Sequence, residues 1–266
     1  MSSKKFPTVR GSSRIINLPI ADFFVQQFGS GSPILWLHSE DYYELSLPLI
    51  QNLAQKYKVI VPWMPGYGKT DLPNKIRTID DLSYAYLDLL EKLKLQKLRL
   101  VGFSVGGWLA NEIASKDCSR ISKMSLVCPL GVKIGGPYDR DIEDIYYHPT
   151  AKVQSLKFSN PKQDPMVPTE LSESEAFVLA RSKETTAKLC WDPYFHNPTL
   201  KNRLHRITVK TQVIWGSRNR LAKVKYGKAY AKLLPKSDFV SISGTGHFPH
   251  VERPDRFDPI LNKFLR

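Results

Sequence analysis

Short apolar runs without polar alternation recur along the chain. Such runs are typical of strands that are buried on both faces, as in a parallel sheet. In chain order they are Ile34–Leu37, Val59–Val61, Leu98–Gly102 and Ile121–Cys128, and two further strands are predicted at Thr211–Trp215 and Phe239–Ser243. Two further β-like runs, Ile15–Ile20 and Phe23–Phe28, come before them. The hydrophobic pattern therefore predicts a central sheet made mostly of parallel strands.

Segments with the helical spacing of apolar residues separate these runs. Helices are predicted at about Leu45–Lys56, after Thr78, at Val105–Ser115, before Leu234 and from Arg253 onward. Thr78 is a candidate N-cap, and the two aspartates that soon follow it suit the positive end of a helix dipole. Strands that alternate with helices predict an α/β fold with helices on both faces of the sheet.

The alternation breaks off between residues 130 and 208. This stretch has scattered prolines, many charges and no clean strand. Because about 80 residues is too long for a simple loop, we interpret it as a helical cap, or lid, that lies over one end of the sheet. The predicted domains are a core of residues 1–129 and 209–266 and a cap insertion of residues 130–208.

Ser104 lies in a glycine-rich turn between a predicted strand and a predicted helix. The turn reads Gly102-Phe103-Ser104-Val105-Gly106-Gly107, which matches the G-x-S-x-G nucleophile elbow in the context that this motif requires. A sharp turn at the serine leaves room only for small residues two positions away, and glycine occupies both positions. The N–H of Val105 then lies at a helix N-terminus, where it can face an anion.

A serine hydroxyl is a weak nucleophile unless a base accepts its proton. The chain order of nucleophile-elbow enzymes predicts a histidine after the last strand. His247 stands there, between Gly246 and Phe248. His250 is a nearby alternative, but it lacks the preceding glycine, so His247 is the preferred candidate base.

These motifs resemble those of α/β-hydrolase fold enzymes with a serine nucleophile and a helical cap. The stretches that carry the resemblance are His38-Ser39, Pro65–Asp71, Gly102–Gly107, Trp215-Gly216 and Gly246-His247 with the later Glu252. The resemblance implies an acyl-enzyme on Ser104, with an oxyanion hole made by the N–H groups of Val105 and Glu40. It implies a structural role for Glu252. It also argues against dehalogenase and epoxide hydrolase chemistry, which uses an aspartate nucleophile in this fold.

The position of the triad acid departs from the family pattern. Where the family has Trp-Gly-x-x-Asp, this chain reads Trp215-Gly216-Ser217-Arg218-Asn219. An amide carries no charge to stabilise an imidazolium, and its NH₂ group can favour the wrong histidine tautomer. In serine proteases the same replacement lowers kcat by about 10⁴-fold. Asn219 is therefore expected to complete a weakened triad. A carboxylate of the early cap could replace it, and Asp144 is the first choice among Asp139, Asp141, Glu143 and Asp144.

Further residues are expected near the substrate. The candidate substrate-binding residues are His38, Ser39, Phe103, Trp191 and Phe248. Ser39 replaces the usual glycine beside the oxyanion hole, where the backbone geometry is demanding. The carboxylate of Glu40 would oppose an anionic transition state unless its side chain points away. Trp191 belongs to an aromatic cluster that either packs between cap and core or lines an apolar pocket.

The composition is that of a globular protein with an unusual charge. The chain has 266 residues, and its 39 basic and 25 acidic residues give a net charge of +14. Such an excess raises the question of nucleic-acid binding, but no zinc-finger, RRM or KH pattern accompanies it. Eight basic residues and no acidic residue lie between Lys210 and Lys236. Arg218 and Arg220, within this stretch, either favour an anionic substrate or lower the basicity of the histidine.

The three lysines of the predicted helix in this stretch share one face. They are Lys225, Lys228 and Lys232, and their spacing indicates a solvated surface. Most of the excess charge is therefore interpreted as surface charge on the outside of the core.

The sequence contains no apparent membrane span, secretory signal or metal motif. No apolar run reaches the ~18 residues of a spanning helix, and the three cysteines lack zinc or redox spacing. The basic segment before residue 15 is either a terminal tail or a short transit segment. We expect a cytoplasmic monomer or homodimer that needs no metal or cofactor. Its expected partner is a small-molecule substrate, and neither nucleic acid nor a membrane.

The sequence favours a serine hydrolase that cleaves a carboxylic ester or similar acyl bond of a small, largely apolar substrate. A non-hydrolytic ligand-binding pseudo-enzyme or receptor remains an alternative, as does a lyase or cofactor-free oxygenase with His247 as base. A carbon–carbon bond hydrolase is a further alternative. Such enzymes usually have asparagine and tryptophan where this chain has Phe103 and Phe248, which disfavours this chemistry.

Overall fold

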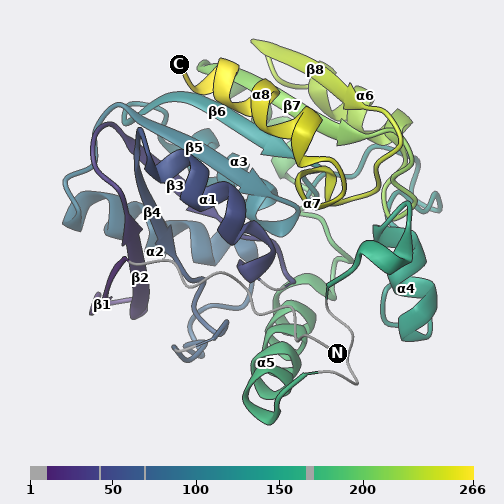
Figure 1. Cartoon of the computed structure of the whole chain (residues 1–266), viewed down its shortest axis with the longest axis horizontal. Coiled ribbons are helices and arrows are strands. Elements are labelled where there is room, and N and C mark those ends of the chain that lie inside the picture. The colour runs from purple at the N-terminus through teal and green to yellow at the C-terminus, as the bar shows by residue number, and fades with distance from the viewer. Residues whose placement is uncertain (1–10, 42, 69, 166–170) are drawn as a thin grey trace.

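The computed structural model describes residues 11–41, 43–68, 70–165 and 171–266 (Figure 1). The predicted N-terminal tail or transit segment lies mostly outside the described residues. Three free cysteines are described, Cys118, Cys128 and Cys190.

Eight strands form one sheet in the order β1-β2-β4-β3-β5-β6-β7-β8. The strands are β1 (Ser12–Ile16), β2 (Phe23–Phe28), β3 (Pro33–Leu37), β4 (Lys58–Pro62), β5 (Leu98–Phe103), β6 (Ile121–Val127), β7 (Lys210–Gly216) and β8 (Ser237–Ile242). The first two strands pair antiparallel, and β3 to β8 are parallel throughout. The predicted mostly parallel sheet is therefore confirmed. The one notable shift is at β1, which begins and ends earlier than the apolar run Ile15–Ile20.

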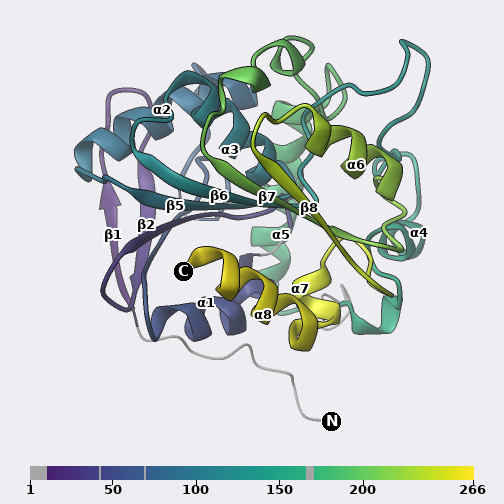
Figure 2. The same ribbon diagram turned by 90° about the horizontal axis from the view of Figure 1, so that it is seen from above.

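Helices cover both faces of the sheet, as Figure 2 shows. One face is covered by α1 (Leu47–Ala54) and α8 (Pro254–Leu265), and the other by α2 (Ile79–Lys92), α3 (Val105–Lys116) and α6 (Val224–Lys232). Each face buries its own hydrophobic cluster. The clusters meet the sheet from opposite sides because parallel strands without polar alternation are apolar on both faces. A short helix, α7 (Pro249–Glu252), follows the last strand.

The start of α2 agrees with its sequence signal. The Thr78 hydroxyl accepts the N–H of Asp81, and the Asp81 carboxylate accepts the N–H of Thr78 in return. This reciprocal pair is a capping box, which satisfies two backbone donors that the first helical turn leaves without partners.

The chain between β6 and β7 forms several helices, of which the first lie over the carboxyl end of the sheet and the last packs beside the C-terminal end of α3. They are α4 (Thr150–Lys157), α5 (Glu173–Cys190) and the 3₁₀ turns Pro161–Gln163, Leu200–Asn202 and Leu204–Arg206; a further 3₁₀ turn, Tyr43–Ser46, precedes α1. Two hydrogen bonds join helix α5 to the loop after β4. Thr185 donates to the carbonyl of Gly66, and the hydroxyl groups of Thr186 and Tyr67 share a hydrogen bond. The division into core and cap at residues 130 and 208 stays a prediction.

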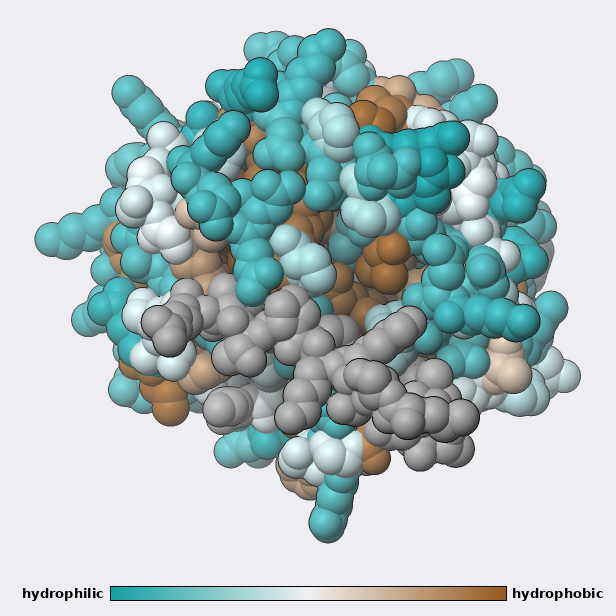
Figure 3. Space-filling view, viewed as in Figure 1, coloured by the Kyte–Doolittle hydropathy of each residue, from teal (hydrophilic) through white to brown (hydrophobic). Residues whose placement is uncertain are grey.

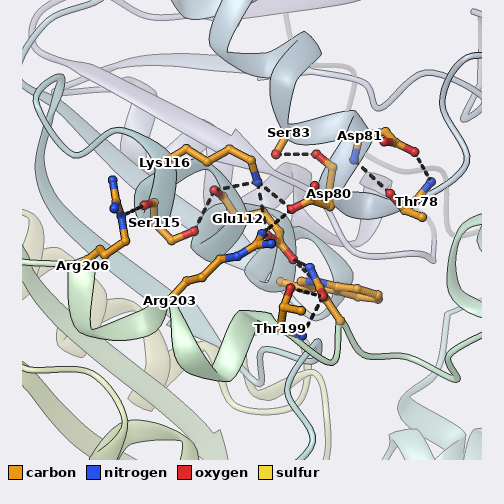
Figure 4. A network of polar contacts seen from close by, with 12 residues as sticks. Thr78, Asp80, Asp81, Ser83, Glu112, Ser115, Lys116, Thr199, Arg203 and Arg206 are labelled. Carbon is orange, nitrogen blue, oxygen red and sulfur yellow. Dashed lines mark hydrogen bonds and ion pairs between the residues drawn. The ribbon is translucent and has the colours of Figure 1, made fainter.

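A buried polar network joins α2, α3 and the end of this insertion (Figure 4). Glu112 on α3 has no exposed side-chain surface and accepts hydrogen bonds from Trp108 and Asn197. Lys116 lies 3.3 Å from Glu112 and 2.8 Å from Asp80, and Arg203 lies 2.8 Å from Asp80. The helix that follows the candidate nucleophile is thereby tied to the chain that returns from the insertion.

The surface agrees with the interpretation of the basic excess. Lys225, Lys228 and Lys232 are all exposed on α6. The face drawn in Figure 3 is largely hydrophilic, and hydrophobic side chains reach the surface mainly near its centre.

Candidate active site

Ser104 sits in a strained turn at the end of β5. Its backbone angles are φ 50° and ψ −115°, in the left-handed half of the map that non-glycine residues rarely adopt. A Cβ added at Gly102 would lie 2.5 Å from the carbonyl oxygen of Gly106, and one at Gly106 would lie 2.3 Å from that of His38. Both neighbours must therefore be glycine, as the sequence argument requires.

His247 reaches this serine from the loop after β8. Its Nε2 lies 2.8 Å from the Oγ of Ser104, and both side chains are buried. A hydrogen bond connects this loop to the chain between β6 and β7: the N–H of His247 donates to the carbonyl of Lys157 at 2.5 Å. Glu252 accepts N–H bonds from Gly246, Ser159 and Asn160, which gives this carboxylate a structural position.

Asn219 approaches the other nitrogen of the histidine. Its Nδ2 lies 3.0 Å from Nδ1 of His247, while its Oδ1 accepts the backbone N–H groups of Leu221 and Ala222, each at 3.1 Å. Backbone N–H groups can only donate, so the amide cannot be turned around without losing both bonds. Asn219 therefore donates to Nδ1, and the imidazole proton resides on Nε2, where it is donated to Ser104. In this tautomer Nε2, the nitrogen that faces Ser104, already carries a proton and cannot accept the serine proton.

Burial keeps the His247 imidazole neutral. Burial, with a smaller contribution from the nearby ammonium of Lys157, lowers its pKa from 6.5 to about 3, and Asp41 opposes this shift. The neutral ring is the form that a general base needs, but its proton is on the wrong nitrogen for that task.

The carboxylate of Glu40 lies at the backbone N–H that would bind an oxyanion. Its Oε2 is 3.5 Å from the N of Val105, and the residue is only 4% exposed. The side chain thus points into the oxyanion position, which is the unfavourable arrangement that the sequence left open. A negative charge already occupies the place where negative charge would develop during acyl transfer.

Lys157, the last residue of α4, pairs with this carboxylate across the boundary between insertion and sheet. Its Nζ lies 3.5 Å from Oε1 of Glu40 and makes a closer ion pair with Asp41. Burial disfavours the charged form of Lys157, but Asp41 and then Glu40 outweigh burial and raise its pKa. The buried ammonium of Lys157 is therefore shared between the carboxylates of Glu40 and Asp41.

A cavity of about 260 Å³ lies directly above this group. Its walls are largely apolar, and the apolar and aromatic residues that line it are Leu45, Ile145, Tyr146, Val153, Phe158, Leu179 and Phe248. Glu40, Asp41 and Lys157 form the charged part of the wall, and the described lining includes neither Ser104 nor His247. The carboxylate of Glu40 thus stands between the cavity and the candidate nucleophile.

The predicted substrate-binding residues are not all brought together. Phe248 lines the cavity. Phe103 packs against Trp36 and His250 on the α1 and α8 face of the sheet. Trp191 is 56% exposed and lines a separate surface hollow with Tyr194.

His38 and Ser39 lie in the loop that carries Glu40. Nδ1 of His38 donates to the carbonyl of Ser39 at 2.7 Å, and its Nε2 accepts the N–H of Met64 at 2.9 Å. Burial lowers the pKa of His38 to about 4, although the hydrogen bond to Ser39 opposes this shift. The neutral ring therefore braces the loop.

Asp144 does not take the place of the triad acid. Its carboxylate accepts the N–H groups of Tyr146 and Tyr147, and Nδ1 of His247 faces Asn219 instead. Arg218 and Arg220 line an outer hollow beside Asn219 rather than the apolar cavity, and Arg220 donates to the carbonyl of Phe158.

Lys157 was not recognised from the sequence. It is one of 39 basic residues, lies in a weakly amphipathic stretch and belongs to no motif. Only the tertiary contact with Glu40 and Asp41 distinguishes it. Within the part of the chain that the structure describes, no group of three or more His, Cys, Asp or Glu residues could hold a metal ion. None of the described helices is long and apolar enough to cross a membrane.

Comparisons with known proteins agree with this geometry. A family model described as alpha/beta hydrolase fold matches residues 28–254. Monoacylglycerol lipase ABHD6 of Mus musculus is 24% identical over 89% of this chain and 76% of its own length. A 2-hydroxy-6-oxononadienedioate/2-hydroxy-6-oxononatrienedioate hydrolase of Paraburkholderia phymatum is 27% identical over 79% of this chain and 76% of its own. A solved membrane phospholipase A, 20% identical, superposes with a TM-score of 0.79 and covers 96% of this chain and 86% of that one.

Proposed function

Because the chain belongs to the alpha/beta hydrolase fold family, we propose that it is a serine hydrolase that cleaves a carboxylic ester or similar acyl bond. The proposed substrate is small and largely apolar. The observation that carries this proposal is the 2.8 Å contact between Ser104 Oγ and His247 Nε2 at the nucleophile elbow. One relative is named as a monoacylglycerol lipase and another as a 2-hydroxy-6-oxononadienedioate/2-hydroxy-6-oxononatrienedioate hydrolase, and these names make acyl transfer the reaction class to test first.

In the proposed reaction Ser104 attacks the carbonyl carbon and His247 takes the serine proton. His247 gives this proton to the leaving alcohol as the acyl-enzyme forms. It then takes a proton from the attacking water and returns it to Ser104 as the acid product leaves. The N–H of Val105 and that of Glu40 would hold the oxyanion. Two obstacles make the proposed turnover slow: the Nε2–H tautomer favoured by Asn219 and the carboxylate of Glu40 at the oxyanion position.

The same two obstacles favour a second candidate, a pocket that binds a ligand without cleaving it. A histidine that donates to the serine leaves the hydroxyl unactivated, and a filled oxyanion position opposes acyl transfer. In this case the elbow is retained as a structural feature of the fold, and the cavity above Glu40 is the binding site.

A fluorophosphonate probe and short-chain p-nitrophenyl esters distinguish the two candidates. A hydrolase is labelled at Ser104 and releases p-nitrophenol faster than its Ser104→Ala variant. The matched control is Ser174→Ala, which changes an exposed serine of α5 and should retain full activity. If the wild-type chain is neither labelled nor faster than Ser104→Ala, the hydrolase proposal is wrong and the ligand-binding candidate stands.

A further inference from the structure

The buried carboxylate of Glu40 has poor partners. Its two oxygens lie 3.5 Å from Val105 N and 3.5 Å from Lys157 Nζ, whereas charge-assisted hydrogen bonds are normally about 2.7–2.9 Å long. Among the described residues, none donates a hydrogen bond to Oε1. Lys157 is drawn instead to Asp41, its closer partner. A buried charge with only such distant contacts is an unfavourable arrangement that a ligand could relieve.

The charges at the floor of the cavity are not balanced. Among the described residues that line this end of the cavity, Lys157 is the one cation beside Glu40 and Asp41, which leaves one negative charge in excess. At the outer wall Asp164 and Lys183 have opposite charges, and His148 is the remaining titratable side chain besides Tyr146. The charge imbalance therefore lies at the inner end, beside the candidate nucleophile.

The remaining wall fits an apolar chain that ends in a cation. Leu45, Val153 and Leu179 can contact a hydrocarbon chain, while Phe158 and Phe248 present aromatic rings to a cation within the cavity. An ammonium group has three N–H donors and no acceptor, which matches a carboxylate that lacks short hydrogen bonds.

We infer that this cavity selects acyl substrates that carry a protonated amine, and that Glu40 is the residue that recognises it. When the ammonium enters, the Glu40 carboxylate turns toward it and leaves the N–H of Val105. The cation thus both satisfies the carboxylate and frees the oxyanion position. This inference rests on the proposed hydrolase function for its catalytic half, whereas its binding half can be tested alone.

The binding half is tested by isothermal titration calorimetry of the full chain with n-hexylammonium, 1-hexanol and hexanoate, which share a chain and differ in head group. The ammonium is expected to bind about tenfold more tightly than hexanoate, as one charge-assisted hydrogen bond allows. Glu40→Gln should abolish this preference. Glu184→Gln, which changes an exposed glutamate of α5, should leave it intact. Equal affinity of the two ions for the wild type, or a preference that survives Glu40→Gln, overturns the inference.

The catalytic half is tested with p-nitrophenyl 2-aminoheptanoate and p-nitrophenyl heptanoate, which share an alkyl chain and differ by an ammonium on the carbon next to the carbonyl. Because Glu40 lies 3.5 Å from the N of Val105, the ammonium and the reacting carbonyl must be close together in the substrate. The wild type should show the higher kcat/KM for the amino ester. Glu40→Gln should lose this preference for the amino ester. It should also hydrolyse the heptanoate faster, because a neutral amide then replaces the negative charge at the oxyanion position. If neither ester is cleaved faster by the wild type than by Ser104→Ala, the hydrolase proposal fails. The relative affinities of n-hexylammonium and hexanoate, measured by calorimetry, then test ammonium recognition by Glu40 on their own. A heptanoate preference in the wild type overturns it.

Discussion

Asn219 presents an N–H group, and not an oxygen, to Nδ1 of His247. The backbone N–H groups of Leu221 and Ala222 donate to the amide oxygen of Asn219, which leaves its NH₂ group to donate to the histidine in this 3.0 Å contact. The proton of the imidazole is therefore placed on Nε2, on the side of Ser104. A single atom, the amide nitrogen where the family has a carboxylate oxygen, reverses the direction of the hydrogen bonds along the whole triad.

Asn219→Asp is expected to reverse this direction. One carboxylate oxygen keeps the bonds from Leu221 and Ala222, and the other accepts a proton from Nδ1, which frees Nε2 to act as a base. We expect kcat for p-nitrophenyl esters to rise by about 10²- to 10⁴-fold, the upper end being the effect of the opposite replacement in serine proteases.

The control for this gain is Asn219→Ala, which removes the donor without supplying an acceptor. It should remain as slow as the wild type. A rate for Asn219→Asp no higher than that of Asn219→Ala would show that the tautomer does not limit turnover.

The sequence predicted the features that depend on local pattern. The apolar runs placed the strands, the Thr78 signal placed the start of α2, and the spacing around Ser104 required the two glycines that the structure shows to be in close contact with backbone. These features could be predicted because each depends on residues that are close in the chain.

The features that decide the chemistry depend on contacts between distant segments. The sequence placed Glu40 next to the oxyanion hole but could not say where its side chain points, because Lys157 attracts it from 117 positions away. The sequence predicts Trp191 as a substrate-binding residue because aromatic residues favour apolar cavities, yet it lies on an outer surface. The orientation of the Asn219 amide likewise depends on backbone N–H groups that no motif reveals.

Gly106→Ala is expected to disrupt the elbow. The added methyl group would lie 2.3 Å from the carbonyl oxygens of both Leu37 and His38, and backbone atoms cannot yield as a flexible side chain can. We expect a loss of about 3 kcal/mol in the free energy of unfolding and loss of labelling at Ser104. Gly136→Ala is the control, since its nearest atom is a flexible Asp139 oxygen at 3.3 Å. Urea denaturation should separate the two variants, and similar stabilities would contradict the steric argument.

Glu112→Ala is expected to be strongly destabilising. It would leave the Trp108 and Asn197 donors without their acceptor and the Lys116 ammonium without one of its two carboxylates. Breaking a buried ion pair typically costs about 3–5 kcal/mol. Glu91→Ala removes the carboxylate of a surface pair with Arg120 and should cost at most about 1 kcal/mol. Equal losses in urea denaturation would show that the network of Figure 4 does not stabilise the fold.

Three buried histidines make stability depend on pH. Burial is the main cause that lowers the pKa of His38 to about 4 and those of His247 and His250 to about 3. The unfolded chain, with histidine pKa values near 6.5, binds more protons than the folded chain between these limits. Stability therefore decreases as the pH falls below about 6.5, by up to roughly 1.4 kcal/mol per pH unit for each histidine.

His250→Phe isolates one of these contributions. The ring of His250 packs against Phe103 and Phe257, and within the described part of the chain its polar contact is a 3.3 Å bond to Ser46. Phenylalanine can therefore replace it without creating a charge at low pH. Between pH 6 and pH 5 the slope of the unfolding free energy should decrease by up to about 1.4 kcal/mol per pH unit. Urea denaturation at several pH values measures this slope, with His205→Gln, at an exposed position, as control. If the slope of His250→Phe equals that of the wild type, protonation of His250 does not contribute to acid destabilisation, and the burial that keeps it neutral is less complete than its packing indicates.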